Sequence, residues 1–382
     1  MTIAHRSRAD HRANWRRSRR GITARAALLA ASLLLLGLAL RSVAPRDLLA
    51  VLAELTLDEL VALALVNALL FASFTARLWL FLRVQGYPIP LRHLLAYRLT
   101  TFGISYFTPG PHLGGEPYQV YALVRRHQVP LPPAVAAVTV DKLLEMLFNF
   151  SFLAGGVLLL LLHQPGAVPW PEQPLALYAL VPLLLPAGLL IALALGRCPL
   201  SGSLNAVDSL SQRLWSRPLL APPRRETIRH SEEAAGLLCR RNPALLLAAG
   251  GLSLLSWLGL IGEFWLLTRM LELPLSLTDA ATALVAARIA ILLPLPAGLG
   301  ALEASQSLAM SSLGLDPGIG IAISLLLRSR DVVMGLSGLW LGGLRYWQWA
   351  AKPAPAGAVG PPAPLAAEPS LLAGGAGPTP PS

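Results

Sequence analysis

Long apolar segments dominate this chain and limit what it can fold into. A helix that crosses a bilayer needs about 20 mostly apolar residues. Only 13% of the residues are charged, whereas soluble domains average about 25%, which excludes a disordered chain and argues against a cytosolic enzyme. We therefore expect an all-α polytopic membrane protein with six full spans, at residues 26–40, 60–82, 135–162, 175–195, 244–270 and 319–344.

Two further apolar pieces are shorter and end differently. Residues 94–107 and 280–295 each run into a break rich in proline and glycine, after which a second short helix is expected. Irregular backbone at membrane depth survives only where protein or a water-filled cavity satisfies its polar groups. These pieces therefore predict two re-entrant hairpins, and counting them as full spans gives an alternative total of eight.

The arginines indicate how the chain is oriented. Residues 1–25 hold eight arginines and the loop 197–242 holds eight, whereas residues 163–174 and 271–278 on the opposite side hold none; Arg83, Arg92 and Arg98 follow the second span. Lysine and arginine gather on the cytoplasmic side of membrane proteins. We expect cytoplasmic N- and C-termini, and the net charge of +11 is an orientation signal that does not indicate nucleic acid.

The distribution of charged and apolar residues divides the chain into three parts. Residues 1–25 form a basic cytoplasmic arm, residues 26–346 a transmembrane domain with a cytoplasmic loop at 197–242, and residues 351–382 a tail. The tail is rich in proline, alanine and glycine, a composition that predicts disorder.

The two breaks match each other in sequence. Pro109–Glu116 and Pro296–Glu303 have the same spacing, and Pro130 and Pro317 continue the same register. Interrupted apolar segments at matching positions in two halves point to a transport site. Three clear spans separate the breaks, an odd number, which predicts an inverted repeat. The alternative is a pair of ordinary helix-breaking loops.

Several charges fall where lipid is expected. A charged residue at the centre of a span costs about 2.5–3.5 kcal/mol on insertion scales, so such residues usually face a partner or a cavity. Arg328 and Asp331 share one helix face and can pair, while Arg330 needs another partner. Arg288 and Glu263 can neutralise each other, although the sequence does not show that they meet.

Two other groups of charges have competing interpretations. Asp141, Lys142 and Glu145 lie near the cytoplasmic end of the third span, where they form either a snorkelling interfacial cluster or part of a site. Glu116 and Glu303 each follow a break and open a short helix. In one interpretation, these carboxylates only stabilise the helix by their favourable interaction with its dipole. In the other, they bind a cation or a proton, while the N–H groups at the helix N-termini bind an anionic headgroup.

These motifs resemble the flippase-like membrane family, the transmembrane region of lysylphosphatidylglycerol synthases, over residues 26–346. The resemblance assigns substrate binding to the two breaks and to the spans after them, and the charges within the last span add Asp331. The predicted substrate-binding residues are Pro109, Gly110, Gly115, Glu116, Asp141, Lys142, Glu145, Pro296, Gly298, Gly300, Glu303, Arg328 and Asp331. Two departures stand out. Lys142 stands where arginine is usual, and a lysine lacks the planar guanidinium that binds two phosphate oxygens at once. Ala297 stands where glycine is usual.

The resemblance implies a lipid transporter of the bacterial inner membrane. It would move a phospholipid, or a polyprenyl-linked or hopanoid-type molecule, between leaflets. Because no aminoacyl-transferase domain follows the membrane region, synthase activity is not expected, and we predict no catalytic residue, metal or cofactor. The expected partners are membrane lipids and enzymes of lipid biosynthesis. The alternatives are an enzyme, or a subunit of one, acting on lipid headgroups, and a scaffold for such enzymes.

Overall fold

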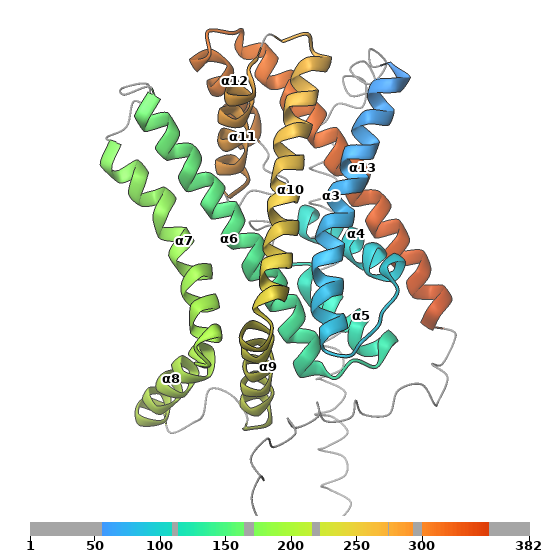
Figure 1. Ribbon diagram of the computed structural model, residues 1–382, viewed down its shortest axis with the longest axis vertical. Coiled ribbons are helices and arrows are strands. Elements are labelled where there is room, and N and C mark those ends of the chain that lie inside the picture. The colour runs from blue at the N-terminus through green and yellow to red at the C-terminus, as the bar shows by residue number, and fades with distance from the viewer. Residues whose placement is uncertain are drawn as a thin grey trace, which may run out of the picture.

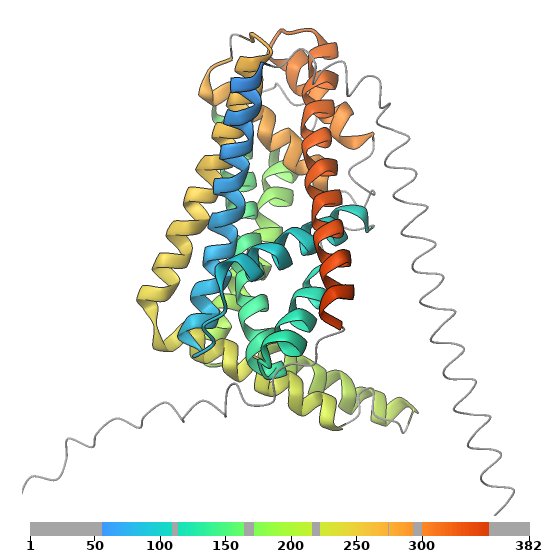
Figure 2. The same ribbon diagram turned by 90° about the vertical axis from the view of Figure 1, so that its right-hand side faces the viewer.

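A computed structural model describes residues 56–108, 114–163, 172–215, 222–273, 275–292 and 300–350. All regular structure in these ranges is helical (Figures 1 and 2). The predicted span at 26–40, the basic arm and the tail lie outside the described residues. The helices are α3 (Leu57–Val84), α4 (Leu91–Phe107), α5 (Glu116–His127), α6 (Leu131–His163), α7 (Glu172–Ala194), α8 (Pro199–Trp215), α9 (Pro222–Arg241), α10 (Pro243–Met270), α11 (Leu277–Leu292), α12 (Ala301–Ser312) and α13 (Pro317–Ala350).

Three of the described helices are long and apolar enough to cross a membrane. They are α3, residues 131–159 of α6, and α10, and the number rises to four if α7 and α8, which meet at 101°, are one broken span. The predicted spans at 60–82, 135–162 and 244–270 therefore coincide with helices of span length. The predicted span at 319–344 lies within α13, which carries Arg328, Arg330 and Asp331. The total of six to eight stays a prediction.

The helices fall into two similar sets, α3–α6 and α10–α13. Corresponding helices begin at a nearly constant interval along the chain, at Leu57 and Pro243, Leu91 and Leu277, Glu116 and Ala301, and Leu131 and Pro317. Local detail repeats as well. The Arg83 guanidinium lies 4.7 Å from the centroid of the Trp79 ring near the end of α3, and Arg269 lies 4.9 Å from that of Trp265 near the end of α10. The repeat seen at the two breaks thus extends over four helices on each side.

The two sets run in opposite directions. In Figure 1, α3 descends while α10 ascends beside it, and α6 ascends while α13 descends; α4 and α5 lie in the lower half, α11 and α12 in the upper. Arg77 Nη1 donates to Ser253 Oγ at 2.8 Å, and Asn67 Nδ2 donates to Glu263 Oε1 at 2.6 Å. Asn67 corresponds to Ser253 in the repeat, and Arg77 corresponds to Glu263. The repeat therefore exchanges these two contacts, as expected across a two-fold axis.

The two sets do not pack equally. Glycines bring α13 close to α4: a Cβ added to Gly338 would lie 2.0 Å from the Leu99 carbonyl oxygen, and one added to Gly103 would lie 2.4 Å from the Gly335 oxygen. Small residues allow such close approach in membrane helix pairs. The corresponding helices α6 and α11 pack less extensively, with a close contact where Gly156 meets Val285. The bundle is therefore tight along α4 and α13 and more open between α6 and α11.

The predicted cytoplasmic loop 197–242 contains two helices, α8 and α9. The α9 side chains Ala235, Leu238 and Cys239 are buried in the hydrophobic core. Glu232 of α9 accepts hydrogen bonds from the Leu200 and Ser201 backbone N–H groups at the start of α8, at 2.7 and 2.8 Å. Both helices lie together at the lower end of the bundle (Figure 2). Buried apolar residues among the arginines explain why this segment folds.

Candidate functional site

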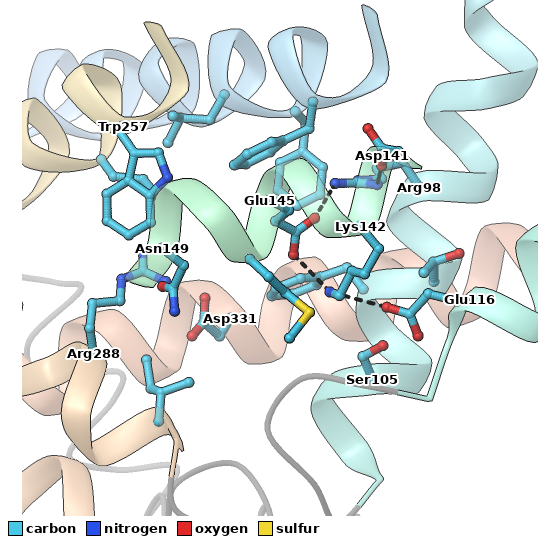
Figure 3. Close-up of a pocket in the computed structure, with 18 of the residues that line it drawn as sticks. Arg98, Ser105, Glu116, Asp141, Lys142, Glu145, Asn149, Trp257, Arg288 and Asp331 are labelled. Carbon is cyan, nitrogen blue, oxygen red and sulfur yellow. Dashed lines mark hydrogen bonds and ion pairs between the residues drawn. The ribbon is translucent and has the colours of Figure 1, made fainter. Parts of the chain in front are cut away.

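A cavity of about 450 Å³ lies among α3, α4, α5, α6, α7, α10, α11 and α13. Aromatic and aliphatic side chains form much of its wall, with rings from Phe71, Phe74, Phe102 and Trp257. Figure 3 shows the charged residues projecting into it from several helices. Eight charged side chains line the cavity: Arg98, Glu116, Asp141, Lys142, Glu145, Arg288, Arg330 and Asp331.

One cluster of ion pairs gathers the predicted charges of the first set of helices. Lys142 Nζ lies 3.1 Å from Glu116 Oε1 and 2.8 Å from Glu145 Oε1. Arg98 binds both acids of α6, with its Nη1 2.7 Å from Asp141 Oδ2 and its Nη2 2.6 Å from Glu145 Oε2. Arg98 therefore lines the cavity, although its position after the second predicted span indicated a cation on the cytoplasmic surface.

Arg77 completes this cluster, although it is not among the predicted site residues. Its Nε lies 2.6 Å from Asp141 Oδ1, and both side chains are 1% exposed. A lone arginine within the apolar segment 60–82 was the available signal, since a buried charge in a span needs a partner. The cluster thus joins three cations to three carboxylates and is close to electrically neutral.

The second set of helices pairs its charges differently from the prediction. Arg328 of α13, which is buried, forms a bidentate pair with Glu303 of α12 and not with Asp331. Arg330 binds Glu263 of α10 and, at 2.8 Å, Asp331. The i,i+3 spacing showed only which residues are neighbours on one helix. The packing of α12 and α10 on different faces of α13 decides which acid each arginine meets.

Glu263 therefore does not take Arg288 as its partner. Its two carboxylate oxygens accept from Arg330 and from Asn67. The Arg288 guanidinium instead lies 5.1 Å from the centroid of the Trp257 ring. Its Nε is buried and has no hydrogen-bond partner among the described residues.

The charges of the two sets correspond to one another. Each glutamate after a break binds a cation of the next long helix: Glu116 binds Lys142, and Glu303 binds Arg328. In a second pair of corresponding positions the charges have opposite signs. Arg77 of α3 binds the acid Asp141 of α6, whereas Glu263, at the corresponding position of α10, binds the cation Arg330 of α13. The repeat thus preserves the position of buried ion pairs more closely than the identity of their members.

The breaks themselves are only partly visible. Pro109, Gly110, Pro296 and Gly298 lie outside the described residues. Gly115, at the start of α5, allows that helix to meet α4, since a Cβ there would lie 2.2 Å from the Thr101 carbonyl oxygen.

Both predicted glutamates lie in the first turn of a short helix. Glu116 also accepts a hydrogen bond from the Gly114 N–H at 2.9 Å, and Gly300 caps the helix of Glu303 with a φ of 77°. Helix stabilisation and ion pairing thus act together, because a carboxylate at this end is favoured by the helix dipole.

The predicted substrate-binding residues do not all meet in one cavity. Glu116, Asp141, Lys142, Glu145 and Asp331 line the large cavity, but the pair formed by Glu303 and Arg328 does not. Glu303 and Arg328, although predicted together with the others to bind substrate, therefore lie outside this cavity. The described residues hold no group of three His, Cys, Asp or Glu side chains placed to bind a metal ion.

A model of the family described as the lysylphosphatidylglycerol synthase TM region matches residues 24–338. The chain belongs to this family. The resemblance inferred from the motifs is confirmed, and membership of a membrane-domain family, together with helices of span length, makes the chain a multi-pass membrane protein. No curated protein and no solved structure gives a significant match.

Proposed function

We propose that this member of the lysylphosphatidylglycerol synthase TM region family moves a lipid, or a lipid-linked molecule, between the two leaflets of a membrane. The observation that carries the proposal is the cavity of about 450 Å³ with eight charged side chains, lined by helices whose outer faces are apolar. A lipid must bring a polar headgroup across a layer where polar groups are costly. A polar cavity inside an apolar bundle removes that cost while the tails stay in lipid.

Paired charges suit this role better than free ones. The cluster around Asp141 is close to neutral, so it adds little net charge to the membrane interior. Asp141 and Glu145 each bind more than one cation. When one of these cations turns to a group on the headgroup, the acid therefore keeps another partner, which avoids an unpaired charge in a low dielectric. A proton or cation gradient can drive the step by acting on the carboxylates.

The two oppositely directed sets supply a way to alternate access. In this proposal, α4–α5 and α11–α12 are re-entrant hairpins that enter from opposite faces of the bacterial inner membrane, with both chain termini in the cytoplasm. The tight contact of α4 with α13 and the looser one of α6 with α11 then exchange roles when the cavity turns to the other leaflet. Cysteines replacing Gly110 and Gly298 should react with impermeant reagents from opposite sides, and labelling from one side would refute the hairpin topology.

Leaflet exchange in reconstituted vesicles tests the function. The purified chain is inserted into vesicles that contain fluorescent phosphatidylglycerol, and an impermeant reductant then destroys the fluorophores exposed in the outer leaflet. We expect the protected inner-leaflet fraction to decay faster than in empty vesicles. Glu116→Gln, which removes one of the two acids bound by Lys142, should slow that decay several-fold.

The matched control is Glu233→Gln, because Glu233 is an exposed acid of α9 that lies away from the cavity. It should exchange lipid at the wild-type rate. Rates equal to those of empty vesicles across several lipid classes would contradict the proposal. In that case, turnover of a lipid substrate by the same preparation would favour the enzyme alternative.

A further inference from the structure

Arg288 differs from the other cations that line the cavity. Arg98, Lys142 and Arg330 each form ion pairs there. Arg288, in the last turns of α11, forms no ion pair with any described residue, and its buried Nε has no hydrogen-bond partner among them. Figure 3 shows its side chain extending from α11 toward the part of the cavity where Asn149 and Asp331 lie.

The nearby acids do not satisfy this guanidinium. Glu263 and Asp331 both bind Arg330, at the adjoining edge of the cavity. A guanidinium carries five N–H donors in a fixed fork, and a buried donor without an acceptor costs free energy in the empty protein. Native structures contain few such groups, and each calls for a physical explanation. An anionic ligand supplies one.

We propose that Arg288 binds the phosphate group of a lipid headgroup, an inference that rests on the proposed function and narrows its substrate to phosphate-bearing lipids. The planar fork of arginine matches two phosphate oxygens, while the Trp257 ring, 5.1 Å away, holds the guanidinium by a cation–π contact. Asn149 lines the same part of the cavity and offers an amide donor to a further oxygen. Phospholipids and polyprenyl phosphates carry the required group, and a neutral hopanoid does not.

Arg288 and the ion-pair cluster lie on different sides of the cavity. The three-cation, three-acid cluster lies toward α4 and α5, and Arg288 lies on the opposite side, beside α10 and α11 (Figure 3). A headgroup whose phosphate binds Arg288 therefore directs its remaining polar substituents toward Glu145 and Lys142. Arg288 then binds the phosphate, and the ion pairs of Glu145 and Lys142 rearrange to bind the polar substituent.

Equilibrium binding to the full-length protein tests this inference without any transport. The purified chain in an uncharged detergent is titrated with dioctanoyl phosphatidylglycerol, and native mass spectrometry follows the fraction that carries one bound lipid. Dioctanoylglycerol, with the same tails and no phosphate, should bind at least about tenfold more weakly, a difference of roughly 1.4 kcal/mol. Equal binding of the two lipids would overturn the proposal.

Two substitutions at Arg288 sharpen the test. Arg288→Gln should weaken binding of phosphatidylglycerol about tenfold or more, and Arg288→Lys should weaken it less, because lysine keeps the charge but loses the fork. The control is Arg83→Gln, since Arg83 also stacks on a tryptophan but lies at the end of α3 and outside the cavity. It should bind as the wild type does.

The remaining outcomes separate a lipid site from other roles. Glycerol 3-phosphate should compete with the lipid only weakly; competition as strong as that of the lipid itself would show that the site takes a free anion. Arg288→Gln should elute as a folded monodisperse protein, and a failure to fold would show that Arg288 is structural. If phosphatidylglycerol binds as described but no leaflet exchange is found, the proposed transport fails while this site stands.

Discussion

Replacing Arg77 with glutamine should destabilise the protein more than any surface arginine substitution. Arg77 is 1% exposed, its Nε lies 2.6 Å from Asp141, and its Nη1 donates to Ser253 across the α3–α10 contact. Removing one partner of a buried ion pair costs about 3–5 kcal/mol. Because Arg98 still neutralises Asp141, we expect the lower end of that range, about 3 kcal/mol.

Reversible unfolding in mixed micelles of dodecyl sulfate measures this cost. The control is Arg83→Gln, whose guanidinium stacks on Trp79 near the end of α3 and should change stability by about 0.5 kcal/mol or less, as for surface substitutions. In the double variant with Asp141→Asn, the two losses should fall short of additivity by about 0.5–3 kcal/mol, since residues in one ion-pair cluster are coupled. An Arg77→Gln loss no larger than that of the control would show that the buried Arg77–Asp141 pair does not hold α3 to α6.

Two further predictions concern packing and cysteine reactivity. Gly338→Ala should destabilise the protein by about 1–3 kcal/mol, because the new Cβ would lie 2.0 Å from the Leu99 carbonyl oxygen where α13 packs on α4. The control, Gly251→Ala, has open space around its position and should not destabilise the protein. Equal losses of stability in an unfolding titration would contradict the close packing of α4 and α13. Burial raises the pKa of the Cys239 thiol to about 11, so in a Cys198→Ser background the native protein should react slowly with maleimide at neutral pH and fully after denaturation. Rapid labelling of that native protein would show that α9 is not packed as described.

Hydropathy and local pattern were enough to predict the long helices and the short helices that follow the breaks. Bilayer length sets the length of an apolar helix, so α3, α6 and α10 could be located from composition alone. The glutamates after the breaks could be located from their spacing, because Glu116 and Glu303 occupy the same register in both halves.

The ion pairs could not be predicted in the same way, because they join helices far apart in sequence. Arg328 and Asp331 share a helix face, but Arg328 pairs with Glu303 because α12 packs on α13. Arg77 was missed because a single arginine hardly lowers the hydropathy of an apolar segment. Its partner, Asp141, lies 64 residues away, and only the tertiary fold brings them together.

The dependence of leaflet exchange on protein copy number shows whether each copy of the protein moves lipid. Vesicles are prepared with increasing ratios of protein to lipid, and the exchange rate of fluorescent phosphatidylglycerol is measured at each ratio. If each copy moves lipid through its cavity, the rate rises in proportion to the number of copies and falls several-fold at every ratio with Glu116→Gln. A rate that stays at the level of empty vesicles at every ratio, or that Glu116→Gln leaves unchanged, would contradict transport through the cavity.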